Sequence, residues 1–227
     1  MEFRTWSSPH LPVDDSVAAM MRRVLLALLP GTACFFWLFG WGVLINLLIA
    51  GVTAVLAEAV MLMLRKRAVT TTLLDGSALL AGILLALALP PLAPWWIPVI
   101  GSLFAIVIAK QLYGGLGYNP FNPAMVGYVV LLISFPLEMT LWPAAGKHPD
   151  LAAAFALFFT GSLPNGMSLD AVTMATPMDA VRTRLGLGEL LSGLQEGPLF
   201  GLVGGAGWEW VNLWFLAGGL WMLKMRV

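Results

Sequence analysis

Residues 24–64, VLLALLPGTACFFWLFGWGVLINLLIAGVTAVLAEAVMLML, decide the fold of this chain. The segment is flanked by basic residues on both sides and contains one charged side chain, Glu58. At 1.5 Å per residue it supplies roughly 60 Å of helix, which is enough to cross a hydrocarbon core of about 30 Å twice. We therefore predict two membrane-spanning helices, Val24–Phe39 and Val43–Leu64, with a break between them at residues 40–42.

The composition of the whole chain agrees with a lipid environment. Of 227 residues, 59% are hydrophobic and 11% are charged, the mean hydropathy is +0.87 and the formal net charge is zero. Such a chain has too few polar residues to cover a water-soluble domain of this size. We predict an all-α integral membrane protein, a polytopic helical bundle with interrupted or re-entrant segments, in contact with the bilayer and with no nucleic acid.

Four further apolar runs predict additional membrane helices. The first ends at Pro90-Pro91 and the second begins at a pair of tryptophans, which suits a turn at the membrane interface. A separate run, Leu151–Leu163, is too short for an ordinary span and predicts an interfacial or re-entrant helix. The four predicted helices are Thr70–Leu89, Trp95 or Trp96 to Lys110, Ala124–Leu137 and Trp210–Met225.

Two prolines interrupt the chain before the helix at Ala124. The sequence Tyr118-Asn119-Pro120-Phe121-Asn122-Pro123 forbids a continuous helix. One interpretation is a broken or re-entrant element that lines a pocket or pathway, because unwound backbone at membrane depth needs protein or water around it. The other is a simple loop before a short helix. The preceding residues 114–117 lack the spacing of a dinucleotide-binding motif.

These segments divide the chain into four predicted parts. Residues 1–23 form a cytoplasmic N-terminal arm with a short amphipathic helix from Ser16, and they lack the pattern of a secretory signal. Residues 24–137 hold five transmembrane segments. Residues 138–209 form an outward-facing segment, and residues 210–227 form the last transmembrane helix.

The distribution of basic residues predicts the orientation. If Leu151–Leu163 does not cross the membrane, nine of the 12 basic residues lie on one side, which the positive-inside rule assigns to the cytoplasm. If it did cross, Lys224 and Arg226 would lie outside, against the rule. We therefore expect Thr176 at the outer surface. The nine residues are Arg4, Arg22, Arg23, Arg65, Lys66, Arg67, Lys110, Lys224 and Arg226.

A turn of small residues in the outward-facing segment, residues 170–177 with the sequence DAVTMATP, holds an isolated hydroxyl on Thr176. This threonine, the proline after it and Asp179 predict a helix N-terminus with Thr176 as the N-cap. The free amide donors at such an N-terminus favour a bound phosphate, and Arg182 and Arg184 are candidates to pair with it. A plain cap followed by solvated arginines is the alternative.

The same turn resembles the Asp-x-x-Ser/Thr-x-Ala-Thr signature of the NqrB/RnfD family of respiratory membrane subunits. In that family the last threonine carries flavin mononucleotide (FMN), esterified through its phosphate. The resemblance implies that Thr176 is the anchor and that its neighbours shape the cofactor site. Ala171 and Met174 stand where glycines are frequent in the family. The matching positions are Asp170, Thr173, Ala175 and Thr176.

The resemblance covers nearly the whole chain, and the Rnf branch of the family is the closer match. Family members continue with further helices, so we expect this sequence to be part of a longer subunit. The segments that carry the likeness, in their usual order, are Ser7-Ser8-Pro9-His10, residues 39–44, residues 75–87 and residues 114–124.

The resemblance implies a subunit of an ion-translocating oxidoreductase of the bacterial inner membrane. Such a complex exchanges electrons between NADH and ferredoxin, coupled to Na⁺ or H⁺ movement. The implied cofactor is covalent FMN, with riboflavin as a candidate second flavin. The implied partners are the other subunits of the complex and a flavin transferase that uses FAD, since no histidine or lysine lies near Thr176 in sequence to act as a base. The subunit is then a carrier and not catalytic alone.

A few residues outside the signature bear on this function. Glu58 lies inside a span, which indicates a cation or proton step, unless the position is close enough to the interface to hydrate. Asp75 and Lys110 stand near helix ends, where they reach water by snorkelling or contact a cofactor. Cys34 is the only cysteine and is expected to serve packing.

No metal site is expected from this sequence. His10 and His148 lie in different polar segments, on opposite sides in the predicted topology, and are interpreted as surface residues. Two rival functions remain open. In the first, a transporter or channel, an interrupted helix near residues 119–123 lines a path and Thr176 is only a cap. The second is a scaffold for neighbouring redox subunits.

Overall fold

The computed structural model describes residues 16–163, 168–189, 193 and 200–225 of the chain. The arm with Ser7–His10 lies outside this part, as do Arg4 and Arg226. The described residues form helices joined by turns, with isolated bridges and no sheet, which confirms the all-α prediction. The elements are α1 Val17–Phe39, α2 Trp41–Leu64, α3 Val69–Leu73, α4 Ser77–Ala88, α5 Trp96–Leu103, the π-helix η1 Phe104–Gln111, α6 Pro123–Ser134, the 3₁₀ turn η2 Glu138–Thr140, α7 Leu151–Thr160, the 3₁₀ turn η4 Leu169–Ala171, α8 Pro177–Gly186 and α10 Trp208–Lys224.

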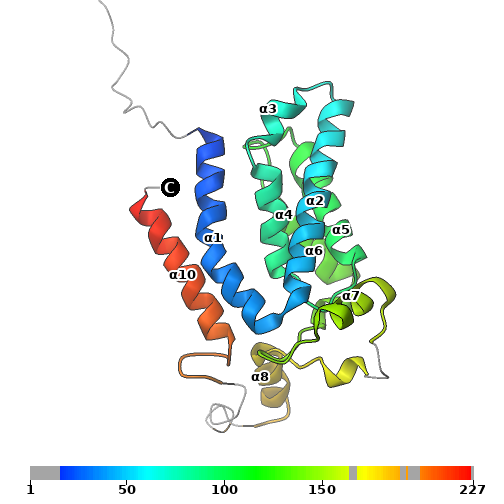
Figure 1. The fold of residues 1–227 in the computed structure, drawn as a ribbon, viewed down its shortest axis with the longest axis vertical. Coiled ribbons are helices and arrows are strands. Elements are labelled where there is room, and N and C mark those ends of the chain that lie inside the picture. Colours follow the sequence, from blue (N-terminus) through cyan, green and yellow to red (C-terminus); the bar gives the residue numbers. More distant parts are fainter. Residues whose placement is uncertain (1–15, 164–167, 190–192, 194–199, 226–227) are drawn as a thin grey trace, which may run out of the picture.

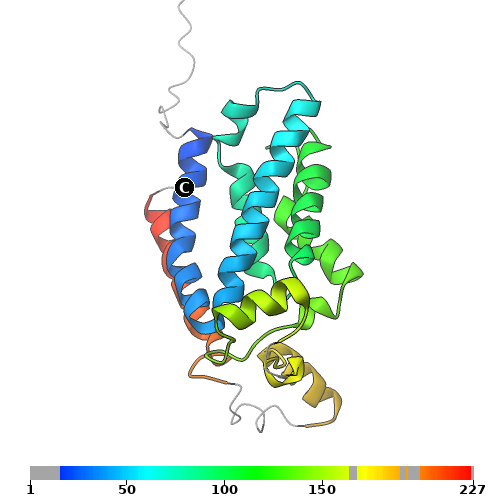
Figure 2. The same ribbon diagram turned by 45° about the vertical axis from the view of Figure 1, so that its right-hand side comes forward.

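The long helices run side by side between two ends of the molecule (Figure 1). We call one the α3 end and the other, which carries α7 and α8, the α8 end. The helix α4 packs mainly on α2, and α10 packs on α1. Figure 2 shows the α1–α10 pair as one edge of the bundle, with α2, α4, α5 and α6 beside it. Helices α1 and α2 are each long and apolar enough to cross a membrane.

The first two helices meet at a sharp corner, as predicted. Gly40 has φ of +79°, a backbone conformation that suits glycine, and it separates α1 from α2. The N-terminal end differs from the prediction, because the expected amphipathic helix and the first span form one continuous helix. Ser16 caps it by accepting a hydrogen bond from the Ala19 amide, and Pro30 is accommodated within it.

The third predicted span is divided in two. Residues expected as one helix over Thr70–Leu89 form the short α3 and, after a turn, α4. At this turn Gly76 has φ of +76°, and Asp75 Oδ1 accepts a hydrogen bond from the Ser77 amide at 2.7 Å. An aspartate that bonds the backbone two residues ahead offers a turn in place of the helical bond.

Two further segments, the chain before α6 and the short helix α7, have defined structures. Residues 112–122 form an exposed, turn-rich loop, and Asn122 caps α6 by accepting from the Ala124 amide. This is the loop alternative, since these residues contain no helical turn continuous with α6. The helix α7 lies across the α8 end (Figures 1 and 2), where the Trp95 amide donates to Phe158 O at 3.1 Å.

Adjacent glycines of α10 give a test of how closely α1 and α10 pack. A Cβ on Gly218 would lie against the Ala27 carbonyl oxygen, nearer than van der Waals contact, whereas a Cβ on Gly219 would meet nothing within 4 Å. We expect Gly218→Ala to destabilise the bundle by about 1–3 kcal/mol, as other overpacked contacts do. The measurement is the apparent Tm in detergent. Gly219→Ala is the control and should leave Tm unchanged or raise it, since alanine is the better helix former. An equal response of both variants would contradict the packing.

Candidate functional site

The turn before α8 is held against a second loop of the chain. Thr173 pairs with Pro143 in an antiparallel bridge, and the Met174 amide donates to Trp142 O at 2.8 Å. The Thr173 hydroxyl donates to Leu169 O at 3.1 Å. Thr173 therefore has a structural role, which is to fix the extended residues that lead to Thr176.

Thr176 is the N-cap of α8, as the sequence predicted. Its hydroxyl oxygen accepts a hydrogen bond from the Asp179 amide at 3.3 Å and donates to Asp179 Oδ2 at 2.7 Å. Pro177 occupies the first helical position. The half-buried hydroxyl thus has a fixed position at the positive end of a helix, where amide donors are available to an anion.

Thr176 lies on the wall of a groove of about 350 Å³ at the α8 end. The indole rings of Trp142 and Trp208 stand 5.0 Å apart at 64° and form its aromatic side. Lys147 is exposed and supplies a cation. The groove is lined by Trp142, Pro143, Ala144, Ala145, Lys147, Met174, Ala175, Thr176, Pro177, Ala206 and Trp208.

The aromatic side of the groove rests on the end of α1. The Trp208 ring centroid lies 4.7 Å from that of Phe39 at an interplanar angle of 48°, and the Trp142 centroid lies 6.2 Å from the same ring. The Gly146 amide donates to Leu38 O at 2.7 Å, which ties the Lys147 loop to α1. Cys34 belongs to the same buried cluster, consistent with its expected packing role.

The other predicted site residues lie in different surroundings. Ala175 lines the groove, and the backbone of Asp170 belongs to η4 while its side chain lies outside the described part. Arg182 and Arg184 are exposed on α8, two turns or less from the N-cap, and are not among the residues that line the groove. The sequence analysis did not identify three residues of the groove, Trp142, Lys147 and Trp208, because they are distant in sequence from Thr176. The available signal was a tryptophan and a lysine in the same polar segment as Thr176.

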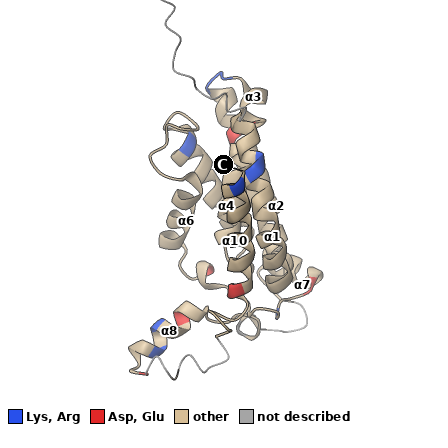
Figure 3. Ribbon diagram, turned by 90° about the vertical axis from the view of Figure 1, so that its left-hand side faces the viewer, with Lys and Arg blue, Asp and Glu red and all other residues tan. Residues whose placement is uncertain are grey.

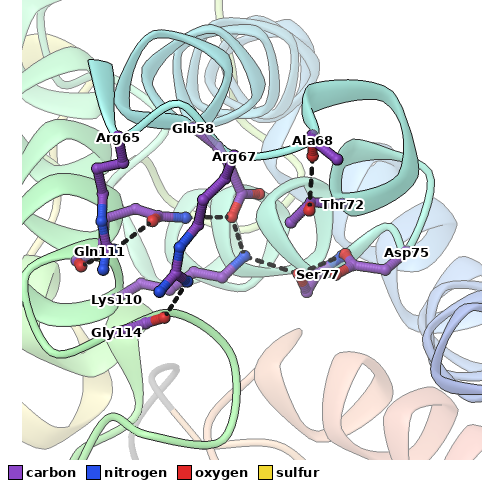
Figure 4. A network of polar contacts seen from close by, with 10 residues as sticks. All are labelled: Glu58, Arg65, Arg67, Ala68, Thr72, Asp75, Ser77, Lys110, Gln111 and Gly114. Carbon is purple, nitrogen blue, oxygen red and sulfur yellow. Dashed lines mark hydrogen bonds and ion pairs between the residues drawn. The ribbon is translucent and has the colours of Figure 1, made fainter. Parts of the chain in front are cut away.

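A second cluster of polar groups lies toward the α3 end, inside the bundle (Figure 4). Glu58 of α2 is fully buried, and its Oε1 lies 2.6 Å from Lys110 Nζ of η1. Gln111 Nε2 donates to the same oxygen at 2.7 Å. Glu58 Oε2 is buried without a hydrogen-bond partner. Glu58 is therefore an interior acid and does not hydrate at the interface.

Two further branches extend this cluster. Lys110 Nζ donates to Ser77 Oγ at 2.7 Å, and Ser77 Oγ donates to Asp75 Oδ1 at 2.5 Å. On the other side, Arg65 Nη1 donates to Gln111 Oε1 at 3.1 Å and to the Gln111 carbonyl. We call these six side chains the polar network: Glu58, Arg65, Asp75, Ser77, Lys110 and Gln111.

Snorkelling was the wrong prediction for Lys110. The side chain is 2% exposed, because it turns inward to Glu58 instead of outward to water. The π-helical geometry of η1 accompanies this inward turn, and both Lys110 and Gln111 are buried there. Asp75 is half-buried at the α3–α4 turn, close to its expected place at a helix end. His148 is exposed, as predicted, and His10 lies outside the described residues.

Fold and site together define a helical membrane protein with a hydroxyl-bearing groove at one end and a buried ion pair toward the other. Residues 4–227 match the family model described as the NQR2, RnfD, RnfE family, and the chain belongs to that family. It is 49% identical to the D subunit of the ion-translocating oxidoreductase complex of Escherichia coli strain SE11, over 100% of this chain and 68% of the relative. The same-named protein of strain K12 / DH10B is 48% identical over the same shares.

The ion pair predicts an unequal response to single and double substitution. Lys110→Met leaves the Glu58 carboxylate buried without its cation, which typically costs about 3–5 kcal/mol. Adding Glu58→Leu removes the stranded charge, so the double variant should recover most of the lost stability. The measurement is the apparent Tm in detergent of four proteins: the wild type, Lys110→Met, Glu58→Leu and the double variant. Additive losses in the double variant would contradict direct pairing in the folded protein.

Proposed function

We propose that this chain is a membrane subunit of an ion-translocating electron-transport complex of the Rnf type, carrying FMN esterified to Thr176. It relays electrons between NADH and ferredoxin, coupled to movement of Na⁺ or H⁺. The observation that carries the proposal is the Thr176 hydroxyl on the wall of a groove with an aromatic side and a cation. Membership of the family supports it.

The groove suits a flavin phosphate in both shape and chemistry. Its volume falls in the range of small-molecule sites, and the rings of Trp142 and Trp208 offer apolar faces to a planar heterocycle. A phosphate on Thr176 would meet the amide donors of α8 and the charge of Lys147. FMN supplies one-electron chemistry when bound, and the ester keeps it on the protein. Riboflavin remains the candidate second flavin.

Attachment changes the hydrogen bonds of the cap. An esterified Thr176 has no proton to donate, and Asp179 Oδ2 now lies 2.7 Å from its oxygen. The Asp179 carboxylate must then turn from the phosphate, whose charge it repels. Arg182 stands three residues further along α8, the spacing at which opposite charges pair on a helix. In the modified protein the Asp179 carboxylate would form an ion pair with Arg182. The phosphate would keep its hydrogen bonds to the amides of α8 and its attraction to Lys147.

The proposed partners and location follow from the proposal of a flavin-carrying subunit. A separate transferase would deliver the flavin from FAD, since the described residues bring no histidine or lysine to hydrogen-bond the Thr176 hydroxyl. Other subunits of the complex would pass electrons to and from this carrier in the bacterial inner membrane. The rival channel function loses its motivating observation, because residues 112–122 form an exposed loop.

Substitutions at Thr176 separate the anchor from the cap. Thr176→Asn keeps a good N-cap but cannot form a phosphoester, so α8 should persist while covalent flavin is lost. Thr176→Ser should keep both. Thr173→Val is the control, since the Thr173 hydroxyl bonds Leu169 O. The measurement is in-gel flavin fluorescence, with intact mass, after co-expression with the transferase. A fluorescent Thr176→Asn protein would place the flavin elsewhere, and an unmodified wild type would end the carrier proposal.

The orientation of the bundle has its own test. Six described basic residues belong to segments at the α3 end (Figures 1 and 3). They are Arg22 and Arg23 near the start of α1, Arg65, Lys66 and Arg67 between α2 and α3, and Lys224 at the end of α10. The positive-inside rule then makes the α3 end cytoplasmic and the α8 end periplasmic.

Membrane-impermeant maleimide checks this orientation in intact cells. Leu187→Cys, at an exposed position after α8, should be labelled, and Thr71→Cys on α3 should react only after the membrane is opened. The wild-type chain is the background, because Cys34 is buried. The reverse labelling pattern would invert the topology.

A further inference from the structure

We propose that Asp179 is a catalytic residue for attachment of the flavin, whose carboxylate takes the proton of the Thr176 hydroxyl while that oxygen attacks the flavin donor. The inference rests on the proposed function, because it requires Thr176 to be the anchor. It goes beyond that function by giving this chain, and not only the transferase, a part in the chemistry of its own modification.

The Thr176 hydroxyl donates a hydrogen bond to one carboxylate. Its oxygen lies 2.7 Å from Asp179 Oδ2. A general base must lie at such a distance from the group whose proton it removes. In protein kinases an aspartate accepts the proton of the substrate hydroxyl during phosphoryl transfer in the same way. Asp179 is therefore in position to accept the proton of Thr176.

This contact is not the one that an ordinary capping box uses. In a capping box the side chain at the third helical position bonds the backbone amide of the N-cap residue. Asp179 occupies that position in α8, but its Oδ2 accepts from the side-chain hydroxyl of Thr176. The cap itself is made by the Asp179 amide, which donates to the Thr176 oxygen at 3.3 Å. The carboxylate is thus available for another purpose.

The other polar groups around the turn are not suited to take this proton. Lys147 lines the groove as a cation, which suits it to hold the phosphates of the donor. The Thr173 hydroxyl donates to Leu169 O. The arginines of α8 are always protonated. Within the described part of the chain, Asp179 is the carboxylate that hydrogen-bonds the Thr176 hydroxyl.

In the reaction one P–O bond forms and another breaks. The Thr176 oxygen attacks the phosphorus on the flavin side of the FAD pyrophosphate. The bond from that phosphorus to the AMP oxygen breaks with its electron pair, and AMP leaves. The Thr176 proton passes to Asp179, whose exposed side chain then returns it to water. Protonation also removes the negative charge of Asp179 while the phosphate binds the neighbouring oxygen.

Two effects of the Asp179 charge act in opposite directions and differ in size. The charge repels the incoming pyrophosphate, but the interaction of exposed charges changes an equilibrium by about fivefold at most. General-base catalysis typically contributes about 10²–10⁴-fold to a rate. Removal of the carboxylate should therefore slow attachment. If the carboxylate only repelled the donor, its removal would make attachment faster.

The test measures the rate of attachment to the full chain. The protein is produced without the transferase, purified in detergent, and mixed with excess transferase and FAD. Intact mass and in-gel fluorescence then follow the gain of FMN with time. We expect Asp179→Asn to slow this gain about a hundredfold or more. Asparagine keeps the backbone amide and offers the hydroxyl an acceptor oxygen, so the turn and α8 should persist.

A second variant and a matched control separate the base from the cap. Asp179→Ala loses both the base and the hydrogen bond, so it should be about as slow as Asp179→Asn. Asp150→Asn removes one carboxylate from the N-cap of α7, at the same end of the molecule, and keeps a good cap. This control should gain FMN at the wild-type rate.

Three results would overturn the proposal. A normal rate in Asp179→Asn with a slow Asp179→Ala would mean that the carboxylate only orders the turn. A faster rate in Asp179→Asn would mean that it only repels the donor. Equal slowing in Asp179→Asn and Asp150→Asn would mean that the loss of charge at this end, and not the contact with Thr176, sets the rate.

The wild type distinguishes this inference from the proposed function. A wild-type protein that gains no FMN contradicts both the anchor at Thr176 and the base. A wild type that gains FMN at Thr176, located by peptide mass, while Asp179→Asn gains it at the same rate contradicts the base alone.

Discussion

Close approach of helix backbones is the constraint on which this bundle depends. In lipid there is no hydrophobic drive between helices, so packing and small residues hold them together. The contacts are backbone against glycine in three places: Gly82 of α4 faces the Ala50 carbonyl of α2, Gly127 of α6 faces Gly101 of α5, and Gly218 of α10 faces Ala27 of α1. The α2–α4 contact brings Glu58 and Ser77 within reach of the same lysine.

Strongly apolar segments made most of the fold predictable from the sequence. The corner at Gly40, the start of α8 at Thr176 and the short α7 follow from glycine, capping and length rules that act locally. The residues Asp75-Gly76-Ser77 also form a local turn signal that divides the third span. The high hydropathy of the surrounding residues led to the prediction of one continuous helix instead.

The interior contacts were less predictable, because they join residues far apart in sequence. From its sequence position Lys110 is predicted to be a helix-end residue. The tertiary fold pairs it instead with Glu58, which lies 52 positions earlier in the sequence. The groove has the same property: Thr176 was identified from a signature, whereas Trp142 and Trp208 reach it through the cluster around Phe39. Local rules predict elements, and the partners of a buried or groove-lining side chain require the tertiary fold.

Two hydrogen bonds between Thr176 and Asp179 order the turn before α8. They hold the Thr176 hydroxyl oxygen in one rotamer. Under the proposed function, the entropy of fixing the acceptor is lost during folding and not during group transfer. A misfolded copy, with a floating threonine, would be a poor acceptor, so the attached prosthetic group would mark the copies that had folded correctly.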